Sequence, residues 1–497
     1  MELTPFPASP RFQVFFFQIW EQRASKQPSL GPCPTLCGWR GGQSEGPCIG
    51  RRGCSAASAS CSRSCGVKGP TPPTSVFAGP SESPPSRPQP TCDGAQRRPS
   101  PSTGDPTSMM VTWTTFLPAE SIVLFGRDPG EAFTRSARGW ASRFVDGGKL
   151  GRTAFIHHVS LEGLEPGQRY AYRCGSEQGW SRPYSFQALL NGSDWSPRFA
   201  VFGDLGQVNP QSLPRLQHET EMGLYDVVLH AGTIRGDSDA LVGDAFMRTI
   251  EPVAASVPYM TCPGNHEQKY NFSNYRARFS MPGDTEGLWY SWDVGPVHLV
   301  SFSTEVYFFL EYGQHLVAEQ FQWLEKDLRV RKRRKEHPWI ITMGHRPMYC
   351  SNNDQDDCTQ HESVVRRGLR PHQYGLEDLF YKYGVDLELW AHEHSYERLW
   401  PLFDYEVYNG STEAPYTNPR APVHIIIGSA GCQERLDPFD PEPREWSALR
   451  IEDYGYARMQ VFNRTHLWLE QVSDDQNGKV VDGIWLIKEQ HGPEAWH

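Results

Sequence analysis

The stretch "RFAVFGDLG", Arg198 to Gly206, decides the fold, because an apolar run ends there in a glycine-rich loop that carries an acid. Short apolar runs bounded by turn residues are typical of buried strands. The same pattern recurs in "YDVVLHAG" (225–232), "YMTCPGNHE" (259–267), "VHLVSFST" (297–304), "WIITMGHRPMY" (339–349) and "VDLELWAHEHSYER" (385–398). Residues 315–335 and 376–384 have helical spacing. This alternation predicts a sheet covered by helices, with functional residues in loops at the carboxyl ends of strands.

An earlier region has a different pattern. Between residues 104 and 190, short alternating strands are separated by turns, as in "AFIHHVSLEGLEPGQRYAYRCGS" (154–176). Strands of this length, with turn signals every 8–12 residues or so, predict a small β-sandwich. The Leu-x-Pro-Gly-x-x-Tyr-x-Tyr turn (164–172) resembles a fibronectin type III domain. The region groups no nucleophiles or metal ligands, so we expect a structural or interactive role.

The first hundred residues are expected to lack a core. They hold 11 Lys and Arg against 5 Asp and Glu, are rich in Ser, Pro and Gly, and show no sustained period. Seven of the 12 cysteines lie here, but their spacings lack the paired C-x2-C knuckles of a zinc module. We therefore predict disorder over residues 1–103, or an atypical start to the gene model.

Bulk charge and hydropathy exclude two classes of partner. The formal net charge of −10 argues against a general nucleic-acid binder. No apolar run approaches the roughly 18 residues of a membrane helix. The apolar run Phe12–Trp20 is too short to span a bilayer, and it lacks a clear signal-peptide cleavage site.

Polar side chains follow four of the predicted strands directly. Taken singly, Gly-Asp-x-Gly and Gly-Asn-His are common turns, and an isolated histidine is usually a satisfied core residue. The pair His392 and His394 is more specific, because alternate residues of a strand face the same way. Together these loops predict a metal site. Its candidate residues are Asp204, Asn265, His266, His345, His392 and His394.

Residues 104–485 resemble a purple acid phosphatase, a metallophosphoesterase family, in the animal branch that resembles the plant enzymes. The resemblance rests on the ordered motifs Gly203-Asp204-Leu205-Gly206, Gly264-Asn265-His266-Glu267, "TMGH" ending at His345, and Ala391-His392-Glu393-His394. Alanine replaces the leading glycine of the last motif. The resemblance implies a fibronectin III-like β-sandwich (104–190), then a four-layer αββα sandwich of a catalytic part (197–400) and its C-terminal part (401–485), with a tail at 486–497.

The resemblance also implies a mechanism. Asp204 and His394 would bind an iron(III)-type ion, while Asn265, His345 and His392 would bind a second, divalent metal (zinc, iron or manganese). His266 and His361 would contact the phosphate of the substrate. Such a site hydrolyses phosphate monoesters with a hydroxide activated by two metals. A histidine then protonates the leaving group, most effectively at acidic pH.

The stretch "HAGTIRGDSD" (His230–Asp239) departs from the family pattern. Thr233 stands where the family has a carboxylate that bridges both metals, and Gly236 where it has an iron-binding tyrosine. A 3+ and a 2+ ion about 4 Å apart repel by roughly 25 kcal/mol at an effective dielectric of 20, which bridging anions offset. A rearranged loop could return Asp237 or Asp239 to the site, since Gly236 permits unusual backbone angles.

Two hypotheses therefore remain open from the sequence. The first is an active, secreted acid phosphatase that acts on phosphomonoesters. The second is a catalytically inactive secreted glycoprotein that keeps the fold and one metal. The Arg-Gly-Asp triplet at 235–237 is only a weak sign of integrin binding.

Four glycosylation sequons favour secretion, although no signal peptide is evident: they begin at Asn191, Asn271, Asn409 and Asn463. Cys350 and Cys358 flank a polar loop and could pair there. The basic run Arg331–Lys335 resembles a nuclear signal, but a solvated helix end explains it better. The sequence leaves the oligomeric state and the natural substrate open.

Overall fold

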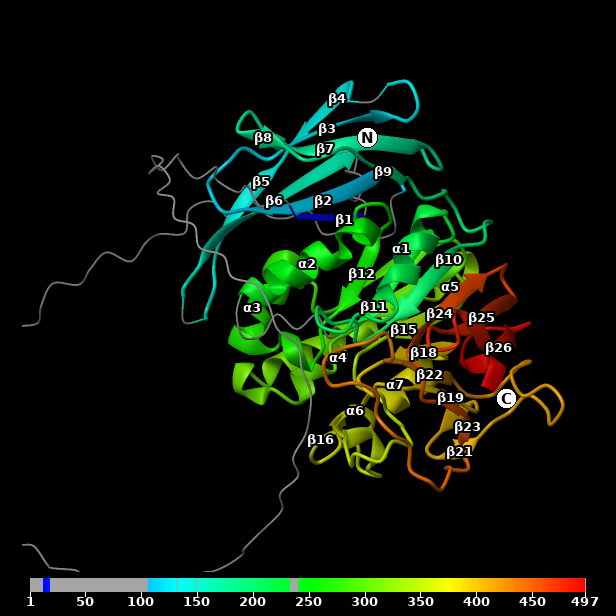
Figure 1. The fold of residues 1–497 in the computed structure, drawn as a ribbon. Coiled ribbons are helices and arrows are strands. Elements are labelled where there is room, and N and C mark those ends of the chain that lie inside the picture. The colour runs from blue at the N-terminus through cyan, green and yellow to red at the C-terminus, as the bar shows by residue number, and fades with distance from the viewer. Residues whose placement is uncertain (1–11, 18–105, 132, 149, 233–239, 497) are drawn as a thin grey trace, which may run out of the picture. The chain divides into compact units, whose positions relative to one another are not determined.

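A computed structural model describes residues 12–17, 106–131, 133–148, 150–232 and 240–496 (Figure 1). Most of the segment 1–103 that was expected to lack order lies outside these residues, and its boundary stays a prediction. Within it, the strand β1 (Phe12–Phe17) pairs in parallel with β2 (Ser108–Thr115). Among the described residues, no helix is both long and apolar enough to cross a lipid bilayer.

Residues 106–187, together with β1, form the expected β-sandwich. One sheet has the order β1-β2-β6-β5, and the other has the order β4-β3-β7-β8, with β9 also pairing with β7. In β7, Tyr170, Tyr172 and Cys174 alternate with more exposed residues and fill the core, as the two-residue period of a strand requires. The remaining strands are β3 (Ile122–Arg127), β4 (Arg135–Arg138), β5 (Trp140–Val145), β6 (Thr153–Glu162), β7 (Arg169–Ser176), β8 (Gly179–Trp180) and β9 (Tyr184–Gln187).

A mixed six-stranded sheet follows, in the order β12-β11-β10-β24-β25-β26. Its first three strands are parallel, and β24 joins them antiparallel to β10. Every residue of β11 and β12 is buried, which explains why these runs are apolar throughout. The strands are β10 (Arg198–Phe202), β11 (Val227–Ala231), β12 (Tyr259–Cys262), β24 (Gly455–Val461), β25 (His466–Ser473) and β26 (Lys479–Ile487).

A seven-stranded sheet lies against the first, in the order β13-β14-β15-β18-β22-β19-β23. Strands β14, β15, β18 and β22 are parallel, so their carboxyl ends share one edge. The strands are β13 (Tyr290–Val294), β14 (Val297–Ser301), β15 (Trp339–Met343), β18 (Leu387–Trp390), β19 (Tyr396–Leu399), β22 (Val423–Ile427) and β23 (Ser447–Ile451). Two small ladders accompany it: β16 (Gly368–Leu369) with β17 (Gln373–Tyr374), and β20 (Leu402–Phe403) with β21 (Glu406–Val407).

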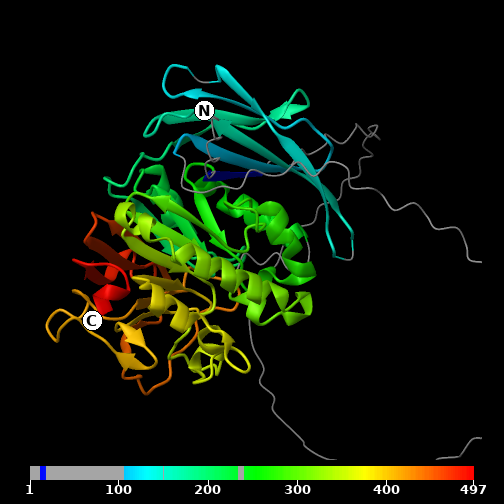
Figure 2. The same cartoon turned by 180° about the vertical axis from the view of Figure 1, so that it is seen from behind.

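Helices cover the outer face of each sheet (Figure 2). On the six-stranded sheet, Tyr456 of β24 donates to Glu219 of α1, and Phe246 of α2 packs against His230 of β11. On the seven-stranded sheet, His298 of β14 hydrogen-bonds Asp327 of α4. The helices are α1 (Leu213–Glu221), α2 (Ala240–Ala254), α3 (Lys269–Arg278), α4 (His315–Leu328), α5 (Arg331–Glu336), α6 (Val364–Arg367) and α7 (Leu376–Tyr383). The helix–sheet–sheet–helix order confirms the predicted fold class.

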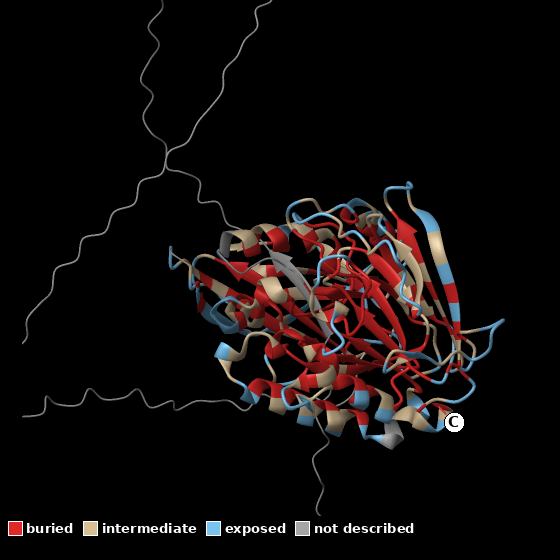
Figure 3. Ribbon diagram, turned by 90° about the horizontal axis from the view of Figure 1, so that it is seen from below, coloured by how far each residue is buried: buried red, intermediate tan, exposed pale blue. Residues whose placement is uncertain are grey.

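Between the two sheets lies the main apolar core, which Figure 3 shows as buried strands running through the centre. The sheets touch through backbone as well as side chains: Gly203 N–H donates to the Ile427 carbonyl at 2.7 Å. This contact joins the carboxyl end of β10 to that of β22. It therefore brings the loops of both sheets to one place.

The stretch with helical spacing at 315–335 forms two helices. Helix α4 ends at Leu328, and α5 begins at Arg331. In α5, Arg334 donates to the carbonyls of Tyr383 and Gly384 at the end of α7. The basic run therefore contributes at least one cation that caps the carbonyl end of a neighbouring helix, where a positive charge is favoured.

The last residues of the chain, predicted as a tail, pack against the seven-stranded sheet. Asp386, directly before β18, is fully buried and accepts a hydrogen bond from Ile340 N–H. Its carboxylate forms an ion pair with Lys488 Nζ at 2.7 Å, and His491 Nδ1 lies 3.1 Å away. Trp496 is buried and donates from Nε1 to the Tyr381 carbonyl.

We predict that Asp386→Asn destabilises the fold by about 3–5 kcal/mol, because it leaves the Lys488 ammonium buried without its counter-charge. Burial alone would raise the pKa of Asp386, but Lys488 and His491 outweigh it and hold the pKa well below the usual value. Because the pKa of Asp386 is lower in the folded than in the unfolded state, its ionised form contributes its full stabilisation above the unfolded pKa of about 4. This contribution decreases as the pH falls below that value. Denaturant unfolding at pH 7 and pH 3 checks the loss of stability in Asp386→Asn and its dependence on pH. Equal stability of variant and wild type at pH 7 would contradict the buried ion pair.

Candidate metal centre

Four loops at the carboxyl ends of strands bring the predicted metal ligands together. Asp204 follows β10, and Asn265 begins a short 3-10 helix after β12. His345 follows β15 of the other sheet, and His392 and His394 lie in the bend between β18 and β19. The site therefore lies where the carboxyl ends of parallel strands from both sheets meet, as expected of sheets of this type.

Short distances link all five residues. His345 Nε2 lies 3.2 Å from Asn265 Oδ1 and 3.2 Å from His392 Nδ1. The backbone N–H of His392 donates to Asp204 Oδ2 at 2.7 Å, and Asp204 Oδ1 lies 3.8 Å from His394 Nε2. Three of the side chains thus form one group and two form an adjoining group. This is the division expected if each group holds one ion.

Each histidine is oriented by a hydrogen bond on its outer side. His345 Nδ1 lies 3.0 Å from the Ala231 carbonyl, and His394 Nδ1 lies 2.8 Å from the Arg435 carbonyl. His392 Nε2 contacts the Asp356 carboxylate. Because an oxygen acceptor fixes a proton on the outer nitrogen, the inner nitrogen of a neutral ring such as His345 is left with its lone pair facing the other predicted ligands. Metal-binding histidines are typically oriented in this way.

The backbone at the site is held in conformations that L-residues rarely adopt. Asp204 has φ 53° and His392 has φ 71°, both in the left-handed region. The spacing of His392 and His394 had predicted that both lie on one extended strand. In the structure they lie in a bend, which directs His392 toward His345 and His394 toward Asp204. Such strain persists where the surrounding structure over-determines it, most often at functional sites.

The charge states differ between the two groups. Burial lowers the pKa of His345 to about 4, so its ring is neutral near neutral pH and able to bind a metal. Burial alone would also lower the pKa of His394, but its neighbours Asp204 and Cys432 outweigh it and raise the pKa. A metal ion at Asp204 and His394 must therefore displace a proton.

Comparison with known proteins identifies the family. The purple acid phosphatase N-terminal domain matches residues 96–188, calcineurin-like phosphoesterase matches 197–396, and the iron/zinc purple acid phosphatase-like protein C model matches 421–483. Purple acid phosphatase 22 of Arabidopsis thaliana is 31% identical over 76% of this chain and 82% of its own length. The chain belongs to the purple acid phosphatase family.

Two further proteins support this assignment. Acid phosphatase type 7 of Homo sapiens is 64% identical over 393 residues, which cover 78% of this chain and 90% of that protein. Among solved structures, a purple acid phosphatase from yellow lupin (Lupinus luteus) seeds is 25% identical with a TM-score of 0.66, over 78% of this chain and 73% of the lupin chain. The resemblance inferred from the ordered motifs is thereby confirmed.

A fifth loop, which the sequence motifs did not reveal, lies beside the predicted ligands of this purple acid phosphatase. Residues 428–434, "GSAGCQE", follow β22, and Cys432 Sγ lies 3.5 Å from both ring nitrogens of His394. Cys432, His394 and Glu434 could together hold a metal ion. Burial raises the pKa of Cys432, against the opposing effect of His394. The sequence signal that could have revealed this loop is its position directly after an apolar run, which forms a buried parallel strand.

An ion-pair network flanks His392. The Arg346 guanidinium donates to Glu305 at 3.1 Å and to Asp356 at 3.0 Å, and its Nη1 lies 2.9 Å from His392 Nε2. Burial alone would raise the pKa of Asp356, but His392 and Arg346 outweigh it and lower the pKa. Asp356 is therefore an anion that orients His392 and neutralises Arg346.

The loop that carries Asp356 is closed by a disulfide between Cys350 and Cys358, as their positions in the sequence had suggested. The two cysteines are buried, whereas Asn353 to Gln355 between them are exposed. The cross-link therefore ties both ends of the loop to the core and holds Asp356 near His392. Among the described residues, the free cysteines are Cys174, Cys262 and Cys432.

The two histidines predicted to contact substrate lie in different surroundings. His266 follows Asn265 in the same turn, and its Nε2 lies 3.7 Å from Glu434 Oε1 in the fifth loop. The His361 side chain is 70% exposed, stacks on Tyr405 and lies 3.3 Å from Glu362. None of its described contacts reaches the five ligands. The residues Thr233, Gly236, Asp237 and Asp239 lie outside the described residues.

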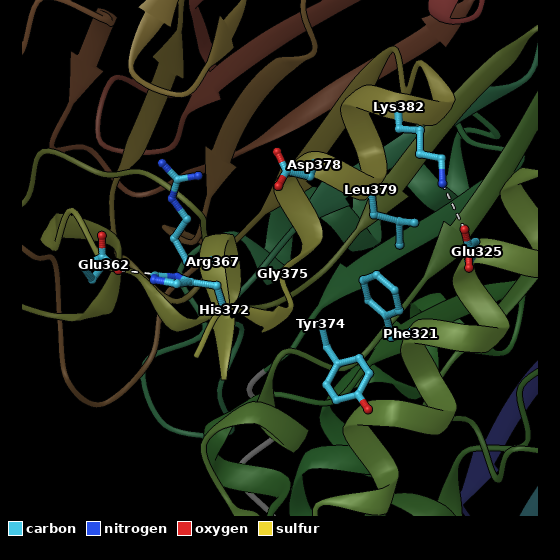
Figure 4. Close-up of a pocket in the computed structure, with 10 residues that line it drawn as sticks. All are labelled: Phe321, Glu325, Glu362, Arg367, His372, Tyr374, Gly375, Asp378, Leu379 and Lys382. Carbon is cyan, nitrogen blue, oxygen red and sulfur yellow. Dashed lines mark hydrogen bonds and ion pairs between the residues drawn. The ribbon is translucent and has the colours of Figure 1, made fainter. Parts of the chain in front are cut away.

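A separate cavity of about 580 Å³ lies between α4, β17 and α7 (Figure 4). None of the five predicted ligands lines it. Two pairs of charges lie within the lining: Lys382 lies 3.1 Å from Glu325, and His372 lies 3.6 Å from Glu362. This cavity is therefore separate from the predicted metal centre.

We predict that Gly232→Ala weakens metal binding at the His345 group. A Cβ on Gly232 would lie 2.2 Å from His345 Nδ1, so the ring would have to move and its hydrogen bond to the Ala231 carbonyl would be disturbed. The matched control is Gly223→Ala, which has a similar positive φ and open space around the added Cβ, so it carries only the backbone strain of about 1 kcal/mol. Elemental analysis after dialysis should show metal loss in the first variant alone; equal metal content in both would contradict the packing.

Proposed function

We propose that this chain is a metal-dependent acid phosphatase that hydrolyses phosphate monoesters. The observation that carries the proposal is the convergence of Asp204, Asn265, His345, His392 and His394, with each histidine's outer nitrogen held by an oxygen. A site built for protein stability alone has no need to point two imidazole nitrogens at one another and a third at a carboxylate. A pair of cations accounts for the arrangement.

The donor set fits a pair of unlike metals. Asp204 offers anionic oxygen, which suits a hard iron ion, while Asn265, His345 and His392 offer amide oxygen and imidazole, which suit zinc, iron(II) or manganese. When bound, two such ions neutralise a phosphate and make water a strong nucleophile at moderate pH. We propose an iron ion and a second divalent metal; the identity of each is part of the proposal.

The chain's own residues would position the substrate and move its protons. His266 shares a turn with Asn265, so we propose that it would contact an oxygen of a phosphate bound beside Asn265. As an imidazolium at acidic pH, it would donate a proton to the leaving alkoxide. His361 is the second candidate, but its exposed position predicts a smaller contribution.

An inactive glycoprotein with the same fold is the second candidate function, and Thr233 and Gly236 are the residues that suggest it. The extent of similarity to acid phosphatase type 7 of Homo sapiens, 64% identity over 90% of that protein, favours the active hypothesis. The oriented histidines favour it as well, because no stability argument requires them.

Purified protein assayed with an aryl phosphate at about pH 5 tests the activity. We expect His392→Ala to lower kcat/KM at least about 100-fold, since even residues that only orient metal ligands contribute 10–100-fold. The matched control is His218→Ala, which removes an exposed histidine from α1. Equal turnover by wild type, His392→Ala and His218→Ala would refute the metal mechanism.

The same assay separates the remaining roles. His266→Ala should lose about 100-fold in kcat, the ordinary range for a general acid, and His361→Ala should lose less. Thr233→Asp tests the inactive hypothesis. Turnover that appears only in Thr233→Asp would identify the natural chain as inactive.

We further propose that the protein is a secreted glycoprotein. Asn191, Asn271 and Asn463 are exposed, whereas Asn409 is half-buried. The Oγ1 hydroxyl of Thr465, the third residue of one sequon, donates to Asn463 Oδ1 at 2.9 Å. The disulfide supports an oxidising compartment. The fibronectin III-like β-sandwich would act structurally: Tyr172 within it donates to the Ala255 carbonyl after α2 at 2.8 Å.

We predict glycan occupancy at Asn191, Asn271 and Asn463, and lower occupancy at Asn409, because the transferase needs an accessible side chain. The measurement is glycopeptide mass spectrometry of protein secreted from cultured animal cells, with single Asn→Gln variants as controls. Retention of all the protein inside the cells without glycan would contradict the proposal.

A further inference from the structure

The outward face of the hairpin formed by β25 and β26 carries aromatic side chains. Leu467 and Leu469 of β25 and Leu486 of β26 are buried in the apolar core. Because successive residues of a strand face opposite ways, the neighbouring Trp468 and Trp485 point outward. The two tryptophans lie directly opposite each other in the antiparallel pair. An antiparallel sheet is usually polar on the side that faces water, so these rings need an explanation.

Trp485 is the centre of a group of four rings, which we call the aromatic cluster: Phe462, His466, Trp468 and Trp485. The ring centre of Trp485 lies 5.2 Å from that of Phe462 and 5.2 Å from that of Trp468. The ring centre of His466 lies 6.1 Å away. Phe462 is 43% exposed and Trp485 is 44% exposed. Single exposed apolar residues are ordinary on a protein surface, whereas adjacent ones often mark a binding surface.

A glycosylation sequon lies between two residues of the aromatic cluster, because Asn463 directly follows Phe462 and Thr465 directly precedes His466. The side chain of Asn463 is exposed, and its Oδ1 accepts hydrogen bonds from Thr465 N–H at 2.8 Å and His466 N–H at 3.0 Å. The side-chain amide is therefore folded back onto the backbone of a cluster residue. Within the described parts of the chain, no group accepts a hydrogen bond from Asn463 Nδ2, the atom to which a glycan is attached.

The turn that carries Asn463 is held in place by neighbouring elements. Trp339 Nε1 of β15 donates to the Asn463 carbonyl at 2.9 Å, and Arg464 donates to a carbonyl near the end of α5 at 2.8 Å. The ring of Trp468 is held as well, because its Nε1 donates to Glu470 at 3.0 Å. A sugar attached to Asn463 would therefore start from a fixed point close to the aromatic cluster.

A pyranose ring suits such a surface. One face of N-acetylglucosamine presents C–H groups with a slight positive charge, while its hydroxyl and acetamido groups project from the rim. The face of an aromatic ring is negative, so it attracts these C–H groups, and stacking leaves the polar rim in water. A sugar tethered to Asn463 would have a roughly millimolar effective concentration at the cluster, as partners joined by short linkers have, so a weak contact would still form.

We propose that the aromatic cluster binds the first N-acetylglucosamine of a glycan on Asn463. The inference rests on the proposed secreted glycoprotein and deepens it, because it gives one of the glycans a binding site on the protein. The sugar would cover Phe462 and Trp485, whose exposed apolar surface would otherwise favour self-association. A second copy of the chain is the alternative occupant, and the test distinguishes it.

Hydroxyl-radical footprinting read by mass spectrometry tests the contact, because it reports the exposure of single side chains. Full-length protein secreted from cultured animal cells is compared before and after native treatment with a peptide N-glycanase. This enzyme leaves an aspartate at position 463, whose oxygens can still accept the hydrogen bonds from Thr465 and His466. A sugar over one face of a ring hides roughly half of its exposed area, so we expect labelling of Trp485 to rise about twofold on glycan removal.

Trimming and matched variants control the experiment. An endoglycosidase that leaves only the first sugar should keep the labelling of Trp485 low, since that sugar makes the contact. Asn463→Gln should show the high labelling, whereas Asn271→Gln, which removes the sequon at another exposed asparagine, should show the low labelling. In Trp485→Ala, glycan removal should lower the Tm less than it does in the wild type. Circular dichroism verifies that each variant is folded.

The outcomes separate this inference from the proposal on which it rests. Secreted protein without glycan at any sequon would overturn both. Secreted protein with glycans elsewhere and none on Asn463 would overturn this inference alone. Equal labelling of Trp485 before and after removal of a glycan from Asn463 would also overturn it. Low labelling that persists after glycan removal and rises on dilution would identify a second copy as the occupant, against the proposal.

Discussion

The site depends on how closely backbone from the two sheets can approach. At Gly203, a Cβ would lie 2.2 Å from the Ala391 side chain, and at Gly428 it would lie 2.9 Å from Asp204 Oδ2. Side chains at these positions would push the sheets apart where Gly203 N–H bonds the Ile427 carbonyl. The convergence of the proposed ligands from distant strands therefore rests on residues without side chains, and the glycines in the sequence motifs are as necessary as the acids and histidines.

Much of this arrangement could be predicted from the sequence. Apolar runs that end in polar loops predict where parallel strands end, and carboxyl ends of parallel strands share an edge, so Asp204, Asn265, His345 and His392 were expected to meet. Each of these apolar runs, with the polar loop that follows it, lies within about ten residues of chain, so it can be recognised from local sequence. The pairing of Cys350 with Cys358 was accessible for the same reason, since only eight positions separate them.

The rest depended on contacts between residues far apart in the chain. Arg346 and Glu305 are 41 positions apart, and Cys432 and His394 are 38 apart, so no local pattern joins them. The bend that separates His392 from His394 needs φ 71° at a histidine, which strand periodicity does not predict. Helix α4 ends at Leu328 although the apolar spacing before it gives no stop signal at that point. Tertiary contacts decide each of these features.

The closing residues of the chain have a practical consequence for anyone who handles the protein. Lys488 and His491 neutralise Asp386 at the start of β18, the strand that leads into the His392 bend. A truncation before residue 488, or a fusion partner inserted ahead of it, would leave the Asp386 carboxylate inside the sheet without its counter-charges and disturb the strand that leads to two of the proposed metal ligands. The packed fold thus includes Trp496, and a reporter is best joined beyond that residue.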